Sequence, residues 1–385
     1  MRMGIILNYW VGWLGGATFV SALIKSLEQV LPQDISLVLL DASVSKAGTI
    51  SSNDMQSDSN LRLILDRLGR EQLDVFCSQE EWVARSGISV VGPSFGDVST
   101  SVPRISYIPD FQHKYYPNYF SDEEIASREV LYKRTLRQSV ACVVNDNSVK
   151  DDILRFYPWF TGEVFVLPRY FAGLSDADLL KPLGRELCED LVHPRDQYLV
   201  VCSQRWAHKR HDLVLKAFGN ARHKLENLIL VFTGPRDDYR NTAIEEEFWS
   251  LVHEMDLSSS IIDLGRVERL QQLSLINNAV ALITASEFEG GVGAAGVEES
   301  VVLGTPVICP NTKLFDALGQ DGNIFRHNFA HSDTEQFATH VSKAKKMGFQ
   351  DRKRPDLVSM EQSVKAAMAQ MISRLDAIAS HAALG

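Results

Sequence analysis

The sequence predicts an α/β protein made of two doubly wound, Rossmann-like domains in tandem. Short apolar runs alternate with helical patterns over most of the chain, which is typical of parallel sheets covered by helices. The 385 residues suffice for two domains that each bury their own core. Residues 173–195 are polar, contain proline and break the alternation. We therefore expect an N-terminal domain at 1–190, a second domain at 195–357 and a closing helical segment at 358–385.

Strands and helices are expected where apolar residues recur with the matching period. In the first half, the expected strands are 4–7, 36–40, 73–77, 89–91, 104–108, 141–144 and 163–167. The clearest helix there is expected at 18–30, where Phe19, Leu23 and Leu27 share one face. In the second half, the expected strands are 198–202, 228–233, 260–264, 279–284 and 306–308. The helices expected there are 212–220, 242–255, 267–276, 297–303 and 334–345, followed by a last helix at 360–380.

The composition is that of a globular protein, with 45% hydrophobic residues and a mean hydropathy of −0.09. No apolar run approaches the length of a membrane span, and the start is too short for a signal peptide. The net charge of −10 argues against general nucleic-acid binding, and it weakens without excluding a basic patch for peripheral membrane contact. Five cysteines lack metal-ligand spacing, so we expect reduced thiols in a cytoplasmic protein.

The most informative stretch is the glycine-rich segment 286–306. Glu289 opens a loop that contains Gly291 and Gly293, and the helix that follows carries Glu298 and Glu299. Backbone N–H groups at a helix N-terminus favour phosphate, whereas carboxylates repel it. The carboxylates are therefore expected to face uncharged sugar hydroxyls, and phosphate beside sugar indicates a nucleotide sugar. The alternative is a glycine-rich turn whose glutamates face solvent and favour the helix dipole.

Other strand-to-helix turns offer weaker sites. Gly15 and Gly16 precede the first helix and can bring amides close to a diphosphate, although paired glycines are often only a tight turn. His113 lies in an aromatic-rich loop and is the best candidate for a proton-handling imidazole. The alternative is that it is an ordinary loop histidine.

The basic loop 202–212 follows the first strand of the second half. Its lysine and arginine side chains could neutralise a diphosphate leaving group, or they could simply be solvated. Gly234 and the turn before Val267 are similar strand-to-turn positions. The acidic pair Asp176 and Asp178 is expected to be a loop or helix start rather than a metal site.

Taken together, these residues resemble the GT-B glycosyltransferases of family GT4, retaining enzymes that use nucleotide sugars, and most closely the bacterial members that build lipopolysaccharide or exopolysaccharide. The resemblance covers nearly the whole chain. In that family two glutamates separated by seven residues precede a strand like 304–308; the first faces the donor sugar and the second binds the ribose hydroxyls. Counting back from Gly304 places the second on Glu299, with Glu298 as its rival. Nine residues separate Glu289 from Glu299, so this loop is longer.

The resemblance extends to the other candidate sites. Residues 109–113, ending in His113, look like the family's "DLQH" stretch, and Lys209 matches the family's lysine for the diphosphate. The family's arginine five residues earlier is Gln204 here, with Arg205 one place away. The resemblance also implies that the base lies near Val267. It further implies that segment 358–385 packs back on the N-terminal domain, that the two domains face one another across a cleft, and that no metal is needed.

The predicted function is retaining transfer of a sugar from a UDP- or GDP-sugar to a hydroxyl of a glycan or lipid-linked acceptor in cell-surface polysaccharide synthesis. The nucleotide sugar is a co-substrate, and no cofactor is expected. The alternatives are a nucleotide-sugar epimerase of the same fold and an inactive, glycosyltransferase-like binding subunit. The resemblance also implies that acceptor recognition belongs to the first domain, where Trp10, Trp13, Tyr115, Tyr116 and a mobile polar stretch at 48–60 are candidates, although the aromatics could equally be core. The sequence leaves the oligomeric state open.

Overall fold

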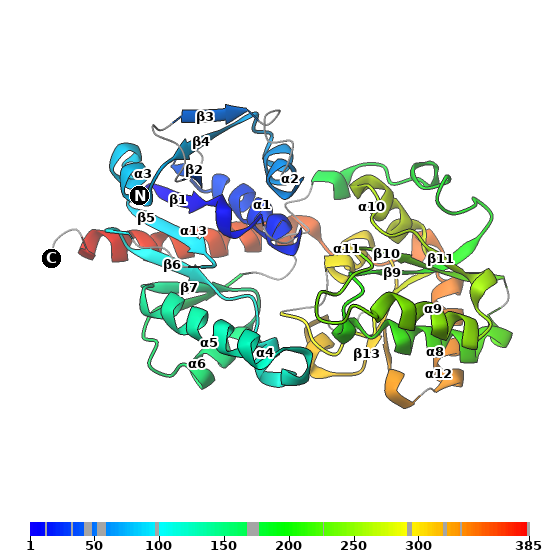
Figure 1. The fold of residues 1–385 in the computed structure, drawn as a ribbon. Coiled ribbons are helices and arrows are strands. Elements are labelled where there is room, and N and C mark those ends of the chain that lie inside the picture. Colours follow the sequence, from blue (N-terminus) through cyan, green and yellow to red (C-terminus); the bar gives the residue numbers. More distant parts are fainter. Residues whose placement is uncertain are drawn as a thin grey trace. The chain divides into compact units, whose positions relative to one another are not determined.

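The computed structural model of the chain describes residues 1–11, 14–31, 34–41, 48–51, 59–96, 100–167, 177–225, 227–290, 295–318, 322–331 and 333–382. They form two compact units, each with a largely parallel sheet (Figure 1). The first unit comprises Met1–Phe111, Ser121–Ser175 and Val358–Gly385, and the second comprises Gln112–Phe120 and Asp176–Leu357. The α/β prediction with two Rossmann-like sheets is confirmed.

The first unit contains an eight-stranded sheet in the order β3-β4-β2-β1-β5-β6-β7-β8. The strands are β1 (Met3–Ile6), β2 (Ile35–Leu40), β3 (Gly48–Ser51), β4 (Gln72–Phe76), β5 (Val90–Ser94), β6 (Arg104–Tyr107), β7 (Ala141–Val144) and β8 (Glu163–Val166). Strand β1 is buried on both faces, because Met3 and Ile5 join the core beneath α1 while Ile6 packs with Trp82 of α3. Continuous apolar runs therefore suit the central strands of this sheet.

The helices of the first unit alternate with its strands. They are α1 (Leu14–Glu28), α2 (Ser59–Leu68), α3 (Gln79–Ser86), α5 (Asp122–Arg137), α6 (Asn147–Phe156) and α13 (Leu357–Ala382). Local caps explain where several begin: the Ser121 hydroxyl accepts a bond from the Glu124 N–H, and three acidic residues occupy the first turn of α5.

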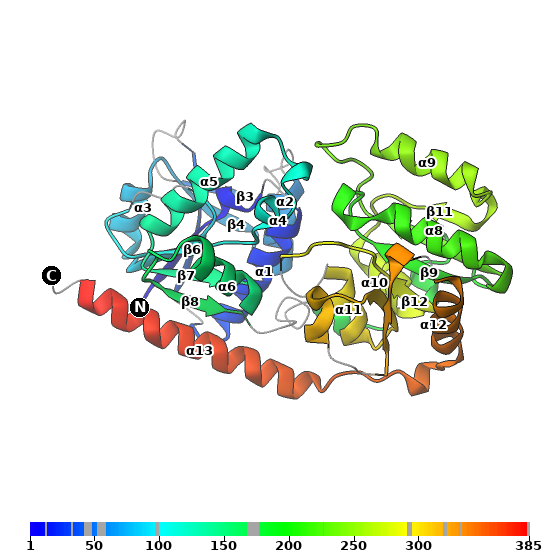
Figure 2. The same cartoon turned by 90° about the horizontal axis from the view of Figure 1, so that it is seen from below.

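The closing helix α13 belongs to the first unit (Figures 1 and 2). Val364, Met368, Met371 and Leu375 recur at helical spacing and are buried in the same core as α1 and β1. This burial fixes α13 to the sheet of the first unit.

The second unit contains a six-stranded parallel sheet in the order β11-β10-β9-β12-β13-β14. The strands are β9 (Gln197–Cys202), β10 (Leu228–Thr233), β11 (Ile261–Asp263), β12 (Ala281–Ile283), β13 (Val307–Pro310) and β14 (Ile324–His327). The helices are α4 (Gln112–Tyr115), α8 (His211–Ala221), α9 (Ile244–Glu254), α10 (Arg269–Asn278), α11 (Ala295–Leu303) and α12 (Thr334–Lys346). Helices α8, α9 and α12 bury their apolar residues in one cluster with the sheet, and α10 packs beside α11.

The change of unit between Ser175 and Asp176 comes earlier than the boundary expected at 190–195. The reason is packing on α10: the Ser274 hydroxyl donates to the Gly184 carbonyl at 2.7 Å, and the Asn277 amide donates to the Leu183 carbonyl at 3.0 Å. These bonds attach the polar stretch to the second unit.

Two strands were not predicted. Strand β3 pairs antiparallel with β4 at the edge of its sheet, and α2 begins at Ser59, so both ends of the polar stretch 48–60 lie in regular secondary structure. Residues 52–58 lie outside the described part of the chain. Strand β14 is an edge strand that is only partly buried, and its sequence lacks a strong apolar run.

Candidate active site

The topology of the second sheet marks one place for a ligand. The chain forms β9, β10 and β11 outward in one direction and then crosses back to form β12, β13 and β14 in the other. The loops after β9 and β12 therefore leave neighbouring strands in opposite directions. In open α/β sheets, ligands bind outside the carboxyl ends of the strands at this switch point. These two loops contain Lys209 and Glu289.

Lys209 and Glu289 form an ion pair at this edge. The Lys209 Nζ lies 2.6 Å from Glu289 Oε1 and 2.7 Å from Oε2, so the ammonium donates to both carboxylate oxygens. The two side chains are only 11% and 9% exposed. The structure thus brings together the two strongest candidates of the sequence analysis, which are 80 residues apart.

Three neighbouring loops are joined at the carboxyl edge. The Gly234 N–H donates to the Gly265 carbonyl at 2.8 Å, and the Gln204 amide donates to the Asp237 carbonyl at 3.3 Å. Gly234 has φ +121°, and a Cβ there would lie 2.5 Å from the Ser203 carbonyl oxygen, so only glycine fits. Val267 is half-buried, just beyond the Gly265 turn and before α10.

Arg205 points into the interior of the second unit. Its guanidinium is 4% exposed, donates to Asp263 Oδ2 at 2.8 Å and lies 3.8 Å from the centre of the Phe248 ring. It was expected to contact a diphosphate, but this structure uses its charge to neutralise a buried carboxylate.

Two histidines beside Lys209 are buried and neutral. Burial lowers the pKa of His208 to about 2, helped by the charge of Lys209. Burial also lowers the pKa of His211 to about 3, helped by Arg205, and its Nε2 lies 2.8 Å from the Ser203 hydroxyl. Neither imidazole therefore adds positive charge to the site at neutral pH.

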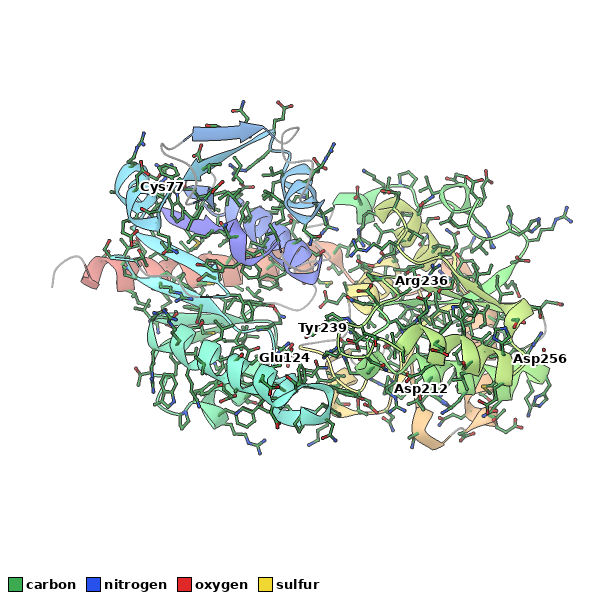
Figure 3. The ribbon with its side chains drawn as sticks, in the orientation of Figure 1. Cys77, Glu124, Asp212, Arg236, Tyr239 and Asp256 are labelled. Atoms are coloured by element: carbon green, nitrogen blue, oxygen red, sulfur yellow. The ribbon has the colours of Figure 1, made fainter. Side chains whose placement is uncertain are left out.

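Glu287 connects the loop after β12 to two other segments. Its carboxylate accepts a bond from the Tyr119 hydroxyl at 2.6 Å and pairs with Arg210, and its carbonyl accepts a bond from the Tyr116 hydroxyl at 3.1 Å. The Arg210 guanidinium also donates to both carboxylate oxygens of Asp212, which lies at the start of α8 (Figure 3). These contacts fix the backbone two residues before Glu289.

Tyr119 belongs to the 112–120 segment, which follows β6 in the chain and packs in the second unit. Replacing Tyr119 by phenylalanine is expected to lower the free energy of unfolding by about 1–2 kcal/mol, because the Glu287 carboxylate loses a hydrogen-bond donor. Chemical denaturation measures this change. Tyr239→Phe is the matched control, since Tyr239 is 64% exposed. Equal losses in both variants would contradict the role of the Tyr119 hydroxyl.

The same segment contains three other predicted residues. His113 is 1% exposed and lies edge-on to Phe120, so its imidazole is buried in the second unit rather than presented to solvent. Tyr115 and Tyr116 were expected to recognise acceptor in the first domain. They instead pack against Phe288, with ring centres 6.0 and 5.9 Å away.

The two adjacent glutamates of α11 have different surroundings. The Glu299 carboxylate is buried and accepts bonds from Arg269 at 2.5 Å and from Gln272 at 3.2 Å, both on α10. Glu298 is half-buried in the first turn. Glu299 therefore ties the N-terminal ends of α10 and α11 together.

The remaining candidates lie in the first unit or outside the described residues. Gly15 and Gly16 form the first turn of α1, after the carboxyl end of β1. Trp10 is fully buried and stacks on Phe19 at 5.3 Å, so it is a core residue, the alternative that the sequence left open. Gly291, Gly293 and Trp13 lie outside the described part of the chain.

Sequence reasoning missed Glu287, Tyr119, Asp263 and Arg236. Glu287 lies two residues before Glu289 in the same loop, and nothing in the sequence distinguishes the directions of their side chains. The position of Asp263 at the end of a strand, followed by Gly265, was the available signal for a residue at the carboxyl edge.

Comparisons with known proteins found one family model and several structures with a similar fold. Residues 185–356 match the family model described as Glycosyl transferases group 1. The fold is similar to sucrose-phosphate synthase from Thermosynechococcus elongatus, with 12% identity, 98% of this chain and 100% of that chain covered, and a TM-score of 0.66. It is also similar to HepE from Anabaena in complex with UDP and glucose, with 14% identity, coverage of 97% and 99%, and a TM-score of 0.61.

A third structure with this fold is UDP-GlcNAc 2-epimerase from Methanocaldococcus jannaschii, with 14% identity, coverage of 95% and 99%, and a TM-score of 0.55. No curated protein matches the chain by sequence. None of the helices in the described ranges has the length and hydrophobicity of a membrane span. The match of residues 185–356 to a glycosyltransferase family model, in a chain that has the GT-B fold, supports a transferase.

Proposed function

We propose that the protein transfers a sugar from a nucleoside-diphosphate sugar to a hydroxyl of a glycan or lipid-linked acceptor, with retention at the anomeric carbon. The Lys209–Glu289 pair carries the proposal, because it places a cation and a carboxylate side by side at the switch point of the second sheet. A diphosphate needs the cation, and sugar hydroxyls need the acceptor oxygens of the carboxylate. The UDP named with HepE supports this class of donor.

In this proposal Lys209 stabilises the leaving group. The bond between the anomeric carbon and the phosphate oxygen breaks, and its electron pair stays on the diphosphate. The acceptor oxygen forms the new bond to the anomeric carbon, and its proton passes to an oxygen of the departing diphosphate. The Lys209 ammonium has three N–H groups, of which two bond Glu289, so a third can reach a phosphate oxygen. A cation placed in advance where charge develops is an effective way to lower such a barrier.

Glu289 would accept bonds from hydroxyls of the donor sugar, and Glu298 or Glu299 from the ribose. His113, in the 112–120 segment, would orient the sugar or the acceptor. Gly15, Gly16, Gly291 and Gly293 would supply backbone N–H groups, with the base near Val267. The proposal requires no bound metal. The resemblance to bacterial enzymes supports a role for this reaction in cell-surface polysaccharide synthesis.

An epimerase of the same fold is the second candidate, supported by the similarity to UDP-GlcNAc 2-epimerase. The group 1 glycosyltransferase match over residues 185–356 favours transfer over epimerisation. The two differ in product, because a transferase releases free nucleotide whereas an epimerase returns a nucleotide sugar.

The test begins with a thermal-shift screen of UDP-, GDP- and dTDP-sugars, since a bound donor raises the unfolding temperature by mass action. The stabilising donor is then incubated with the protein without acceptor, so that water serves as a slow acceptor. NMR identifies the products. Released nucleotide diphosphate with a sugar of the donor's anomeric configuration is expected.

Other results of this test would support the second candidate or contradict the proposal. An epimerised nucleotide sugar would establish the second candidate, and an inverted anomer would overturn retention. Stabilisation by no donor would overturn the proposed function.

A further inference from the structure

One carboxylate in the second unit is shared by two arginines. Asp263 Oδ2 lies 2.8 Å from Arg205 Nη2 and 2.9 Å from Arg236 Nε, and the Asp263 side chain is 2% exposed. Two positive charges thus surround one negative charge. Because Arg205 is 4% exposed and Arg236 is 44% exposed, the surplus positive charge is available to a ligand only at Arg236.

The Arg236 guanidinium is held in place before any ligand binds. Its Nε bonds the Asp263 carboxylate, and its Nη2 donates to the Asp263 carbonyl at 3.0 Å. Its carbon Cζ lies 3.5 Å from where a Cβ on Gly265 would be, so the group rests on a turn without a side chain. Within the described residues Nη1 has no hydrogen bond. An arginine fixed on one side and open on the other loses little freedom on binding.

Arg236 lies among the loops of the candidate site. The turn Gly234–Arg236 packs directly on the loop that leads to Lys209, since the Arg205 N–H donates to the Pro235 carbonyl at 2.9 Å. On its other side is the Gly265 turn, which leads to Val267. Figure 3 shows Arg236 in the second unit. Arg236 is therefore placed between the proposed diphosphate and base positions.

Other cations at this edge already have carboxylate partners. Lys209 pairs with Glu289, Arg210 with Glu287 and Asp212, Arg240 with Asp238, and Arg269 with Glu299. Asp237 and Arg266 are exposed on the neighbouring turns. Arg236 differs from these because the carboxylate that it pairs with in the described part of the chain is also neutralised by Arg205.

We propose that Arg236 binds the phosphate of the donor that is next to the nucleoside, while Lys209 binds the phosphate that carries the sugar. This inference rests on the proposed function. It also explains the buried Arg205, because neutralisation of Asp263 from inside leaves the charge of Arg236 available. Gln204 stands where a diphosphate arginine was expected, and Arg236 supplies that charge from the adjacent loop.

The test measures dissociation constants by isothermal titration calorimetry, with displacement for weak ligands. The probes are UDP, GDP, UMP and GMP, and the intact chain is used throughout. Arg236→Met is expected to weaken the diphosphate and the monophosphate of the preferred base by the same factor, about 10- to 100-fold. Lys209→Met is expected to weaken only the diphosphate. Arg236→Lys should recover most of the affinity, because it keeps the charge.

Arg222→Met is the matched control. Arg222 bonds the Asp256 carbonyl and the Ser259 hydroxyl, beyond the end of α8 and before the start of β11, and so lies at the opposite edge of the sheet. It is expected to leave every dissociation constant unchanged. Arg236→Met should also keep the unfolding temperature near that of the unmodified chain, because Asp263 retains Arg205.

Three outcomes overturn the inference. If Arg236→Met binds nucleotides as the unmodified chain does, Arg236 has no role in binding. If Arg236→Lys is as weak as Arg236→Met, the guanidinium stacks on the base instead of binding phosphate. If the unmodified chain binds neither UDP nor GDP, the proposed function fails together with this inference.

Discussion

Replacing Lys209 by methionine is expected to lower the turnover of the donor about 100- to 1,000-fold, the usual cost of removing one preorganised group that stabilises developing charge. The reason is that Lys209 is the only cation bonded to Glu289 in the described part of the chain, at 2.6 and 2.7 Å. Release of nucleotide diphosphate from saturating donor measures the effect.

The same replacement leaves Glu289, whose side chain is only 9% exposed, with no counter-ion among the described residues. Loss of one partner of a buried pair costs about 3–5 kcal/mol, so the single variant should also unfold more easily. The double variant Lys209→Met with Glu289→Gln separates the two effects. It is expected to recover most of the stability and none of the turnover. Recovery of turnover, or full turnover in a folded Lys209→Met variant, would show that the pair is only structural.

Replacing Asp263 by asparagine is expected to lower the free energy of unfolding of the second unit by about 3–5 kcal/mol. Asp263 neutralises Arg205, whose guanidinium is 4% exposed, and its Oδ1 also accepts the Gly265 N–H at 3.3 Å. Without the carboxylate, the Arg205 charge stays buried and unpaired. Denaturant titration followed by circular dichroism measures the loss.

Two further variants show whether the unpaired charge of Arg205 causes this loss of stability. The double variant Asp263→Asn with Arg205→Met should be more stable than Asp263→Asn alone, because the buried charge is removed together with its partner. Asp256→Asn is the control; Asp256 is exposed and has φ +52°, which asparagine accepts, so its change should stay within about 0.5 kcal/mol. If the double variant is less stable than Asp263→Asn, the lost stability comes from the Gly265 turn and not from the unpaired charge of Arg205.

The periodicity of apolar residues predicted the main elements of both sheets. Central strands such as β1 and β9 are buried on both faces, so their sequences are continuous apolar runs that differ from everything around them. Edge strands carry a weaker signal, because one side lacks a partner strand and fewer positions are buried. The edge strands β8 and β11 were predicted because they still carry apolar runs, whereas β3 and β14 are short and contain polar residues, so these two could not be recognised.

The candidate site was predictable in its residue types and loops. Lys209 and Glu289 each follow a predicted strand, and the parallel order of the strands brings their carboxyl ends to one edge. The direction of each side chain was not predictable. Gln204 and Arg205 are neighbours in the sequence, yet the first lies at the surface of the loop and the second reaches Asp263 in the interior.

The position of a whole segment, residues 112–120, was also not predictable from the sequence. They follow β6 in the chain, and their sequence fits either unit. Their position in the second unit depends on bonds from Tyr116 and Tyr119 to Glu287, which lies 171 and 168 residues further along the chain.

The sequence by itself determined the class of fold, most strands and helices, and the loops that hold the charged candidates, because burial leaves a periodic pattern within a short stretch of chain. Only the tertiary structure decided which charges neutralise one another. Arg205, Asp263 and Arg236 come from three different strand ends, and a buried carboxylate pairs with whichever guanidinium the turns bring within hydrogen-bond distance. That pairing depends on turn geometry and strand register, which no local pattern of residues encodes.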